Sequence, residues 1–208
     1  MTAAFTKLTF TASVKAVQSQ QGSRAAYARL ERSAEGGDVL GLPEAEFIQT
    51  RDGFYQATVS ETGWPYVQFR GGPAGFLKVL DATTLGYADF RGNRQYLSVG
   101  NLNADGRVAL ILMDYANRRR LKIWGRAKVV HESEDPDLLK RLQMPDYRGR
   151  VERAIVIAVE AYDWNCPQHI MPRFTEVEIA QWATTLQKKL AALEEENARL
   201  RIACLGKL

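Results

Sequence analysis

The sequence predicts a mainly β protein, an antiparallel barrel or sandwich with flanking helices, followed by one long C-terminal helix. The first observation is a series of short apolar or alternating segments, separated by Gly, Pro, Asp and Thr, which is typical of consecutive strands. The second is that few helical segments interrupt this series, which argues against a doubly wound parallel sheet. The third is that no Gly or Pro occurs between Thr175 and Gly206, where the apolar residues take a helical period.

Composition places the chain in the ordinary globular class. It has 208 residues, of which 46% are hydrophobic and 25% charged, and this excludes collagen-like, low-complexity and wholly disordered proteins. No apolar run approaches the roughly 18 residues of a membrane span. The segment Met1 to Phe10 lacks the basic start and apolar stretch of a secretion signal, and the two cysteines form no disulfide framework. We therefore expect a cytoplasmic protein with no membrane segment.

The expected helices flank a central block of strands. Ser23 to Ala34 shows helical spacing, and a second short helix is expected over Pro43 to Arg51. A third helix is predicted over Asp135 to Met144, with Ser133 or Asp135 as its N-terminal cap. The predicted strands cover residues 54–59, 66–70, 75–80, 85–90, 108–115, 120–130 and 153–162.

The C-terminal segment combines a helix start with a short zipper pattern. Thr175 followed by Glu178 is a capping box. Six residues then alternate spacings of four and three and form one seam: Leu186, Leu190, Leu193, Asn197, Leu200 and Cys204. An Asn at this kind of seam position favours a parallel, in-register pair of helices, because it meets its symmetry mate there. We expect dimerisation through this helix; the alternative is a single amphipathic helix that packs on its own domain.

Several common sites are excluded because their motifs are missing. The sequence has no glycine motif for dinucleotides, no P-loop and no His-Glu-x-x-His. With only two histidines, His131 and His169, no metal site is expected. The formal net charge is +4, and the basic run from Arg118 to Lys128 is a candidate nucleic-acid surface. Strand alternation would divide its charges between two faces, so we do not expect nucleic-acid binding.

The residues that follow the predicted strand 85–90 form the clearest anion site. In the stretch RGNRQ, Arg91, Asn93, Arg94 and Gln95 bring two guanidinium groups and two amides to a glycine-containing turn. Guanidinium groups and turn N–H groups both bind anionic oxygens. The turn is therefore suited to a phosphate group.

Four segments in order resemble the pyridoxamine 5'-phosphate oxidase-like, FMN-binding split-barrel family. They are GWPYVQFR at 63–70, FLKVLD at 76–81, DFRGNRQY at 89–96 and RRLKIWGRAK at 119–128. The stretches QFRGGP and CPQHI are similar to its branch of general flavin-nucleotide-binding proteins. The resemblance implies a Greek-key-like, FMN-binding split barrel over residues 53–174. A helical segment at residues 1–52 would pack on this barrel, and the amphipathic or coiled-coil helix would occupy residues 175–208.

The resemblance also implies a homodimer with FMN in clefts at the subunit interface. It places Leu77 and Lys78 along the flavin ring, makes Arg94 the first choice for the phosphate, and sets Arg120 at the position of a glutamine near the flavin. The expected cofactor-binding residues are Gln68, Arg70, Leu77, Lys78, Arg91, Asn93, Arg94, Gln95 and Arg120.

Two departures from the family pattern bear on activity. Gln95 stands where the family has a phosphate-binding lysine, and the C-terminal Trp and Arg-Leu signature of the oxidases is not intact. Oxidation of pyridoxamine phosphate itself is therefore not favoured. We expect a flavin-dependent oxidoreductase for a small organic substrate, with NAD(P)H or oxygen as electron partner and His169 as the candidate catalytic residue. The alternatives are a non-catalytic flavin carrier or sensor, and a split barrel that binds haem or a deazaflavin.

Overall fold

The computed structural model describes residues 1–164 and 167–205, with side chains described as far as residue 202. Cys166 and the seam position predicted at the side chain of Cys204 lie outside the described residues. The chain divides into two compact units. The first comprises residues 1–114 and 118–169, and the second comprises residues 115–117 together with the chain from residue 170 onwards.

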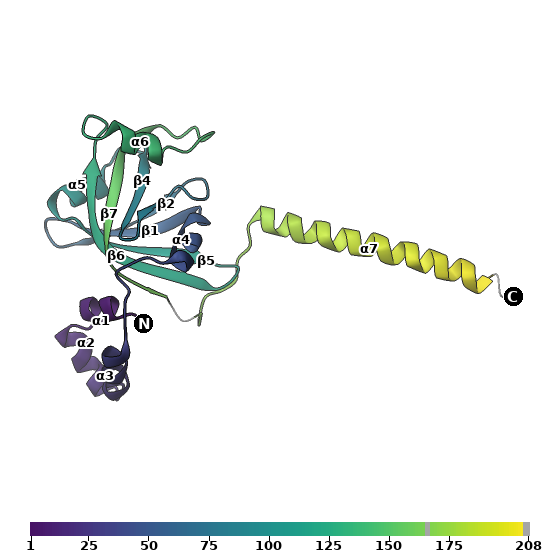
Figure 1. Ribbon diagram of the computed structural model, residues 1–208, viewed down its shortest axis with the longest axis horizontal. Coiled ribbons are helices and arrows are strands. Elements are labelled where there is room, and N and C mark those ends of the chain that lie inside the picture. The colour runs from purple at the N-terminus through teal and green to yellow at the C-terminus, as the bar shows by residue number, and fades with distance from the viewer. Residues whose placement is uncertain (165–166, 206–208) are drawn as a thin grey trace. The chain divides into compact units, whose positions relative to one another are not determined.

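The first unit is built on one antiparallel sheet (Figure 1). Within the described residues, seven strands follow the order β2-β1-β5-β6-β7-β4-β3. Their bounds are β1 (Gly53–Val59), β2 (Pro65–Gly71), β3 (Lys78–Asp81), β4 (Thr84–Phe90), β5 (Arg107–Asp114), β6 (Arg119–Val130) and β7 (Val151–Trp164). The predicted fold class, a mainly β split barrel with flanking helices and a long C-terminal helix, is confirmed.

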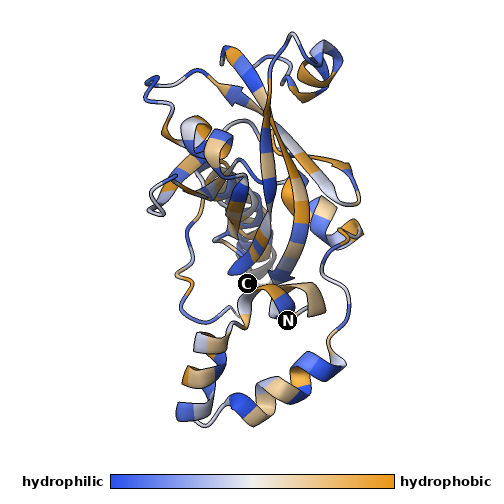
Figure 2. Ribbon diagram, turned by 90° about the vertical axis from the view of Figure 1, so that its left-hand side faces the viewer, coloured by the Kyte–Doolittle hydropathy of each residue, from blue (hydrophilic) through white to orange (hydrophobic). Residues whose placement is uncertain are grey.

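Strands β5 and β6 bury alternate residues over much of their length. Figure 2 shows that apolar residues are frequent along the strands. On β5 the side chains of Val108, Leu110 and Leu112 are buried, and on β6 those of Leu121 and Ile123. These residues belong to one apolar core that β1, β4 and β7 share. Because side chains of a strand point alternately to its two faces, every second residue of β5 and of the first part of β6 enters this core.

The sheet curls so that strands distant in its order meet across the interior. Phe54 of β1 packs against Tyr87 of β4, with ring centroids 5.3 Å apart. The Tyr87 hydroxyl donates a hydrogen bond of 2.8 Å to Oε1 of Gln56 on β1. Arg70 of β2 reaches Asp89 of β4, with 2.9 Å between Nη1 and Oδ1. These contacts bring β2 and β4 together, and the candidate site lies between them.

A glycine allows the longest strand pair to bend. The register of β6 and β7 shifts between Trp124 and Gly125, which marks a bulge. A Cβ atom at Gly125 would lie 2.2 Å from the carbonyl oxygen of Ala158. Only glycine fits where the two backbones approach this closely.

Three helices accompany the strands: α4 (Leu42–Gln49), α5 (Leu97–Ala104) and α6 (Pro136–Leu142). The predicted cap of α6 is confirmed, since Asp135 accepts a hydrogen bond of 2.9 Å from the N–H of Leu138. Helix α5 was not predicted, because its sequence LSVGNLNA contains a glycine, two asparagines and a β-branched valine, all poor helix formers. Burial of Ser98 and Leu102 fixes it to the barrel.

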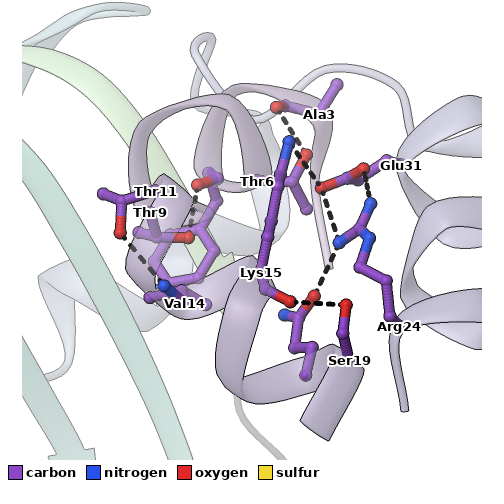
Figure 3. Close-up of polar contacts among 11 residues, drawn as sticks. Ala3, Thr6, Thr9, Thr11, Val14, Lys15, Ser19, Arg24 and Glu31 are labelled. Carbon is purple, nitrogen blue, oxygen red and sulfur yellow. Dashed lines mark hydrogen bonds and ion pairs between the residues drawn. The ribbon is translucent and has the colours of Figure 1, made fainter. Parts of the chain in front are cut away.

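Three further helices precede the barrel: α1 (Ala3–Thr9), α2 (Ala12–Gln20) and α3 (Arg24–Ser33). Of these only α3 was predicted, because α1 is short and α2 is mostly polar, so neither shows a clear apolar period. The ring of Phe5 in α1 lies 6.0 Å from that of Trp124 on β6. Glu31 joins α3 to α2 through Lys15 at 3.5 Å and also pairs with Arg24, as Figure 3 shows.

The second unit contains one long helix, α7 (Glu176–Leu205). Its predicted capping box is confirmed: the N–H of Thr175 donates to Oε2 of Glu178 at 2.7 Å, and the N–H of Glu178 donates to Oγ1 of Thr175 at 3.2 Å. In the same unit the guanidinium of Arg173 lies 4.9 Å from the ring centre of Tyr115. No helix in the described residues has the combination of length and apolar character that crossing a membrane requires.

Candidate functional site

A polar cleft of about 220 Å³ opens beside β2 and β4. Its walls come from these two strands, from the turn that follows β4, from the first turn of α5 and from the start of β7. The lining residues are Tyr66, Gln68, Arg70, Asp89, Phe90, Gly92, Asn93, Arg94, Gln95, Tyr96, Leu97, Ser98, Val99 and Glu152. The cleft therefore combines side chains that are more than 80 residues apart in the sequence.

Strand β2 divides its side chains between the cleft and the outside. Tyr66, Gln68 and Arg70 line the cleft and are half-buried, whereas Val67 and Phe69 are exposed. Oε1 of Gln68 accepts a hydrogen bond of 3.0 Å from the Ser98 hydroxyl, which ties the strand to the first turn of α5. Strand alternation thus gives β2 one polar face toward the cleft and one apolar face away from it.

The turn after β4 has an unusual backbone for non-glycine residues. Arg94 has φ 65° and Tyr96 has φ 54°, both in the left-handed region. Oδ1 of Asn93 accepts a hydrogen bond of 3.1 Å from the N–H of Gln95, which is the geometry of an Asx turn. Residues in this backbone region collect at ligand sites, and both Arg94 and Tyr96 line the cleft.

Asp89 is the buried carboxylate at the base of the cleft, and two guanidinium groups hold it. Its Oδ1 lies 2.9 Å from Nη1 of Arg70, and its Oδ2 lies 3.3 Å from Nε of Arg153. Burial raises the pKa of Asp89, while Arg70 and Arg153 act in the opposite direction. The negative charge of Asp89 is thus compensated by Arg70 and Arg153.

Glu152 is the second carboxylate of the cleft. Its Oε1 lies 3.7 Å from Nε of Arg91 and accepts a hydrogen bond of 3.3 Å from the Tyr96 hydroxyl. Its Oε2 lies 2.5 Å from Nη2 of Arg153, whose guanidinium also lies 4.9 Å from the centre of the Tyr96 ring. Glu152 is therefore engaged by Arg91 and Tyr96 from the segment that follows β4 and by Arg153 on β7.

Arg94 differs from the other arginines of this region. A hydrogen bond with the Tyr96 side chain raises the pKa of Arg94, and the charge of Glu152 acts in the same direction. Among the described residues, Arg94 makes no ion pair with a carboxylate, and its side chain is exposed at the cleft. Three guanidinium groups, those of Arg70, Arg91 and Arg153, thus pair with the two carboxylates, whereas Arg94 lines the cleft without such a pair among the described residues.

Five of the predicted cofactor-binding residues line the cleft: Gln68, Arg70, Asn93, Arg94 and Gln95. Arg91 lies next to them but points to Glu152 instead of lining the cleft. The structure therefore brings the predicted phosphate turn and the predicted QFR strand to one place.

The other four predicted residues lie elsewhere in the described chain. Leu77 is fully buried in the apolar core. Lys78 donates from Nζ to the carbonyl oxygens of Arg141 and Gln143, at 2.6 and 3.3 Å, and so caps the C-terminus of α6. Arg120 is half-buried on β6, and His169 is exposed with a left-handed φ of 62°. Within one chain, none of these side chains lines the cleft.

Several cleft residues were not predicted: Tyr66, Asp89, Tyr96, Ser98 and Glu152. Asp89 and Glu152 meet because β4 and β7 are paired, with Asp89 opposite Arg153. Sequence spacing carries no sign of this pairing. The available signal was the polar Asp89 inside an otherwise apolar strand, since a buried charge requires a charged partner.

Comparison with known proteins gives a family match. The family model for pyridoxamine 5'-phosphate oxidase matches residues 44–184, more than half of the chain. Among curated proteins, no sequence matches this chain.

Solved structures of low sequence identity are also similar to this chain. HupZ from Group A Streptococcus is 16% identical, with 65% of this chain and 99% of that chain covered and a TM-score of 0.49. An FMN-binding protein from Syntrophomonas wolfei is 13% identical, with 59% and 86% covered and a TM-score of 0.45. General Stress Protein 26 from Bacillus anthracis is 17% identical, with 62% and 92% covered and a TM-score of 0.40.

The matched residues 44–184 include all seven described strands and every residue that lines the cleft. The match therefore concerns the barrel and its candidate site together. On this evidence the chain belongs to the pyridoxamine 5'-phosphate oxidase family.

Proposed function

We propose that the cleft binds FMN, with the phosphate of the cofactor held by the turn at residues 91–95. The observation that carries the proposal is the position of Arg94, which faces the cleft without a carboxylate partner among the described residues. A phosphate group carries up to two negative charges and accepts several hydrogen bonds. Guanidinium groups match it with paired N–H donors, and such charge-assisted hydrogen bonds are among the strongest in proteins.

The charge balance around the cleft supports an anionic ligand. Asp89 and Glu152 are both engaged by arginines, so their negative charges are compensated before a ligand arrives. Asn93 and Gln95 add amide groups on either side of Arg94. Several arginines thus lie around the turn in which Gln95 replaces the phosphate-binding lysine of the family. The residues present therefore fit a phosphate.

The size of the cleft supports a site completed by a second copy of the chain. About 220 Å³ is less than the roughly 300–1,000 Å³ typical of small-molecule sites. On the outward face of the same sheet, Tyr55, Val67, Phe69 and Ile111 are exposed. Strand pairing places Tyr55 beside both Phe69 and Ile111, which makes the apolar residues contiguous. A second copy of the chain that covers this face would bury these apolar residues.

FMN, when bound, supplies hydride or electron transfer, so the chain would act as an oxidoreductase for a small organic substrate. The residues of the chain would bind and orient the cofactor: Arg94 the phosphate, and Gln68 and Arg70 the part that extends along β2. NAD(P)H or oxygen is the proposed electron partner. Soluble expression in the cytoplasm is part of the same proposal.

The proposal is tested by adding FMN to the purified protein, removing free ligand by gel filtration and recording the absorption spectrum. We expect flavin bands to co-elute with a dimer of the wild-type chain. Arg94→Ala should weaken FMN binding by about 10- to 100-fold, the value of one charged hydrogen-bonding partner. Arg29→Ala, which removes an exposed arginine from α3, is the matched control and should change binding less than about twofold.

Two outcomes would contradict the proposal. Wild-type protein that retains no flavin at micromolar FMN would remove the cofactor assignment. A Soret band or deazaflavin fluorescence in the purified protein would replace FMN by haem or a deazaflavin. If flavin is retained but neither NADH nor NADPH nor oxygen changes its oxidation state faster than that of free FMN, the protein carries or senses flavin without turnover.

A further inference from the structure

Helix α7 carries an apolar seam whose side chains are exposed. Leu186, Leu190, Leu193 and Leu200 expose 45%, 58%, 62% and 59% of their surface. They recur at spacings of four and three along a helix that is continuous over Glu176–Leu205, so they lie on one face. A helix with such a face gains most of its stability from packing against a partner, not from its own hydrogen bonds.

We propose that α7 pairs with α7 of a second copy of the chain as a parallel, in-register two-stranded coiled coil. In the heptad notation, Leu190 and Asn197 occupy a positions, and Leu186, Leu193 and Leu200 occupy d positions. The described side chains of the seam run from Leu186 to Leu200, which is about two heptads.

Charges that flank the seam identify the second copy as the partner. Lys189 and Glu196 occupy g positions, and Glu194 and Arg201 occupy e positions. In a parallel pair, a g residue faces the e residue five positions further along the other helix. Lys189 therefore faces Glu194 of the second copy, and Glu196 faces Arg201 of the second copy. Both pairings join opposite charges, and two-fold symmetry makes each of them twice.

Asn197 selects the parallel orientation. In a parallel, in-register pair its amide lies against the same amide of the other helix, and the two form a hydrogen bond. In an antiparallel pair, a positions face d positions, so Asn197 would lie against a leucine and its buried amide would lack a partner. The apolar seam, the flanking charges and the single amide thus favour the same arrangement.

The arrangement is tested by distances between spin labels in the full-length chain. Cysteine is introduced singly at Gln181, Lys188 or Ile202, which share the heptad position opposite the seam, after Cys166→Ser and Cys204→Ser. A parallel pair predicts the same inter-chain distance at all three positions. An antiparallel pair predicts distances that lengthen from the middle of the helix toward its ends, because each residue advances about 1.5 Å along the axis. Either this lengthening or the absence of any inter-chain distance would overturn the proposal.

Charge reversal tests the flanking pairs directly, with the label at Ile202. Lys189→Glu sets glutamates against each other and should weaken helix pairing by about tenfold, as should Glu194→Lys. Chains carrying the two changes separately, produced together, should pair with each other as well as the unaltered chains do. Lys188→Glu makes the same charge change one residue away, facing solvent, and should alter pairing less than about twofold. An equal effect of Lys188→Glu and Lys189→Glu would contradict the proposed register.

This pairing does not depend on flavin binding. If the labels report a parallel pair while no flavin is retained, the coiled coil stands and the cofactor proposal fails. If flavin is retained by a dimer whose α7 labels show no inter-chain distance, the opposite holds.

Discussion

The barrel and α7 differ in how much of their apolar side chains is buried within one chain. In the barrel, Leu110, Leu112, Leu121 and Ile123 have no exposed surface, because β1, β4 and β7 cover them within the same chain. In α7, by contrast, the seam leucines keep about half of their surface exposed. Burial of an apolar side chain stabilises by roughly 1.5–3 kcal/mol, so the two regions differ in where that stabilisation comes from. The barrel obtains it within one chain, and under the proposed pairing α7 would obtain it from association.

The largest expected effect is a difference in stability between one leucine substitution in the barrel and the same substitution in α7. Leu121→Ala leaves a cavity in the apolar core, near the start of β6, and should lower the free energy of unfolding of the barrel by about 2–5 kcal/mol. Leu193→Ala, the same substitution on α7, should change it by less than about 0.5 kcal/mol. Urea unfolding followed by tryptophan fluorescence measures both. A loss of barrel stability in Leu193→Ala as large as that in Leu121→Ala would mean that α7 packs as part of the barrel core.

The hydrogen bond between Tyr87 and Gln56 is expected to stabilise the barrel interior by a smaller amount. The Tyr87 hydroxyl is buried and donates to Oε1 of Gln56, whose Nε2 has no hydrogen-bond partner among the described residues. Tyr87→Phe therefore leaves a buried carbonyl oxygen unpaired and should cost about 1–3 kcal/mol of unfolding free energy. The control is Tyr55→Phe on the exposed face of β1, expected within about 0.5 kcal/mol of wild type. If both variants unfold like the wild type, the hydrogen bond across the barrel does not contribute to its stability.

The smallest predicted effect concerns pH and the carboxylate under the cleft. Burial raises the pKa of Asp89, so the folded protein binds this proton more tightly than the unfolded chain does. The contribution of Asp89 to the free energy of unfolding therefore falls as pH rises from the ordinary aspartate pKa to the raised one. Asp89→Asn removes this titration, and its stability relative to wild type should increase with pH across that acidic interval. Parallel pH profiles of the two proteins in chemical unfolding would show that Asp89 has the same pKa in both states.

The sequence predicted the strands that have a clear apolar or alternating pattern. Strands β5 and β7 contain continuous apolar runs and β6 alternates over part of its length, and all three were expected close to their observed bounds. The expected strand at 75–80 begins later, at Lys78, because Phe76 and Leu77 are buried in the core before the strand pairs with β4. Helix α5 could not be predicted, since packing of Ser98 and Leu102 outweighs its poor intrinsic propensity.

The candidate site was predicted only where its residues are neighbours in the sequence. The turn with Asn93, Arg94 and Gln95 was expected because its side chains form one local cluster. Asp89 and Glu152 were missed because strand pairing, not sequence distance, brings them together. Lys78 illustrates the converse, since a chemically suitable residue is engaged by the carbonyl oxygens at the end of α6. Residue type identifies candidates, but contacts decide which of them remain available.

The most direct test of the central claim compares FMN with riboflavin, which lacks only the phosphate. If Arg94 binds that phosphate, the wild-type chain should bind FMN about 10- to 100-fold more tightly than riboflavin in titration calorimetry. In Arg94→Ala this preference should be lost, while the affinity for riboflavin stays the same. An equal preference for FMN in both proteins would show that the phosphate is bound elsewhere and would contradict the account.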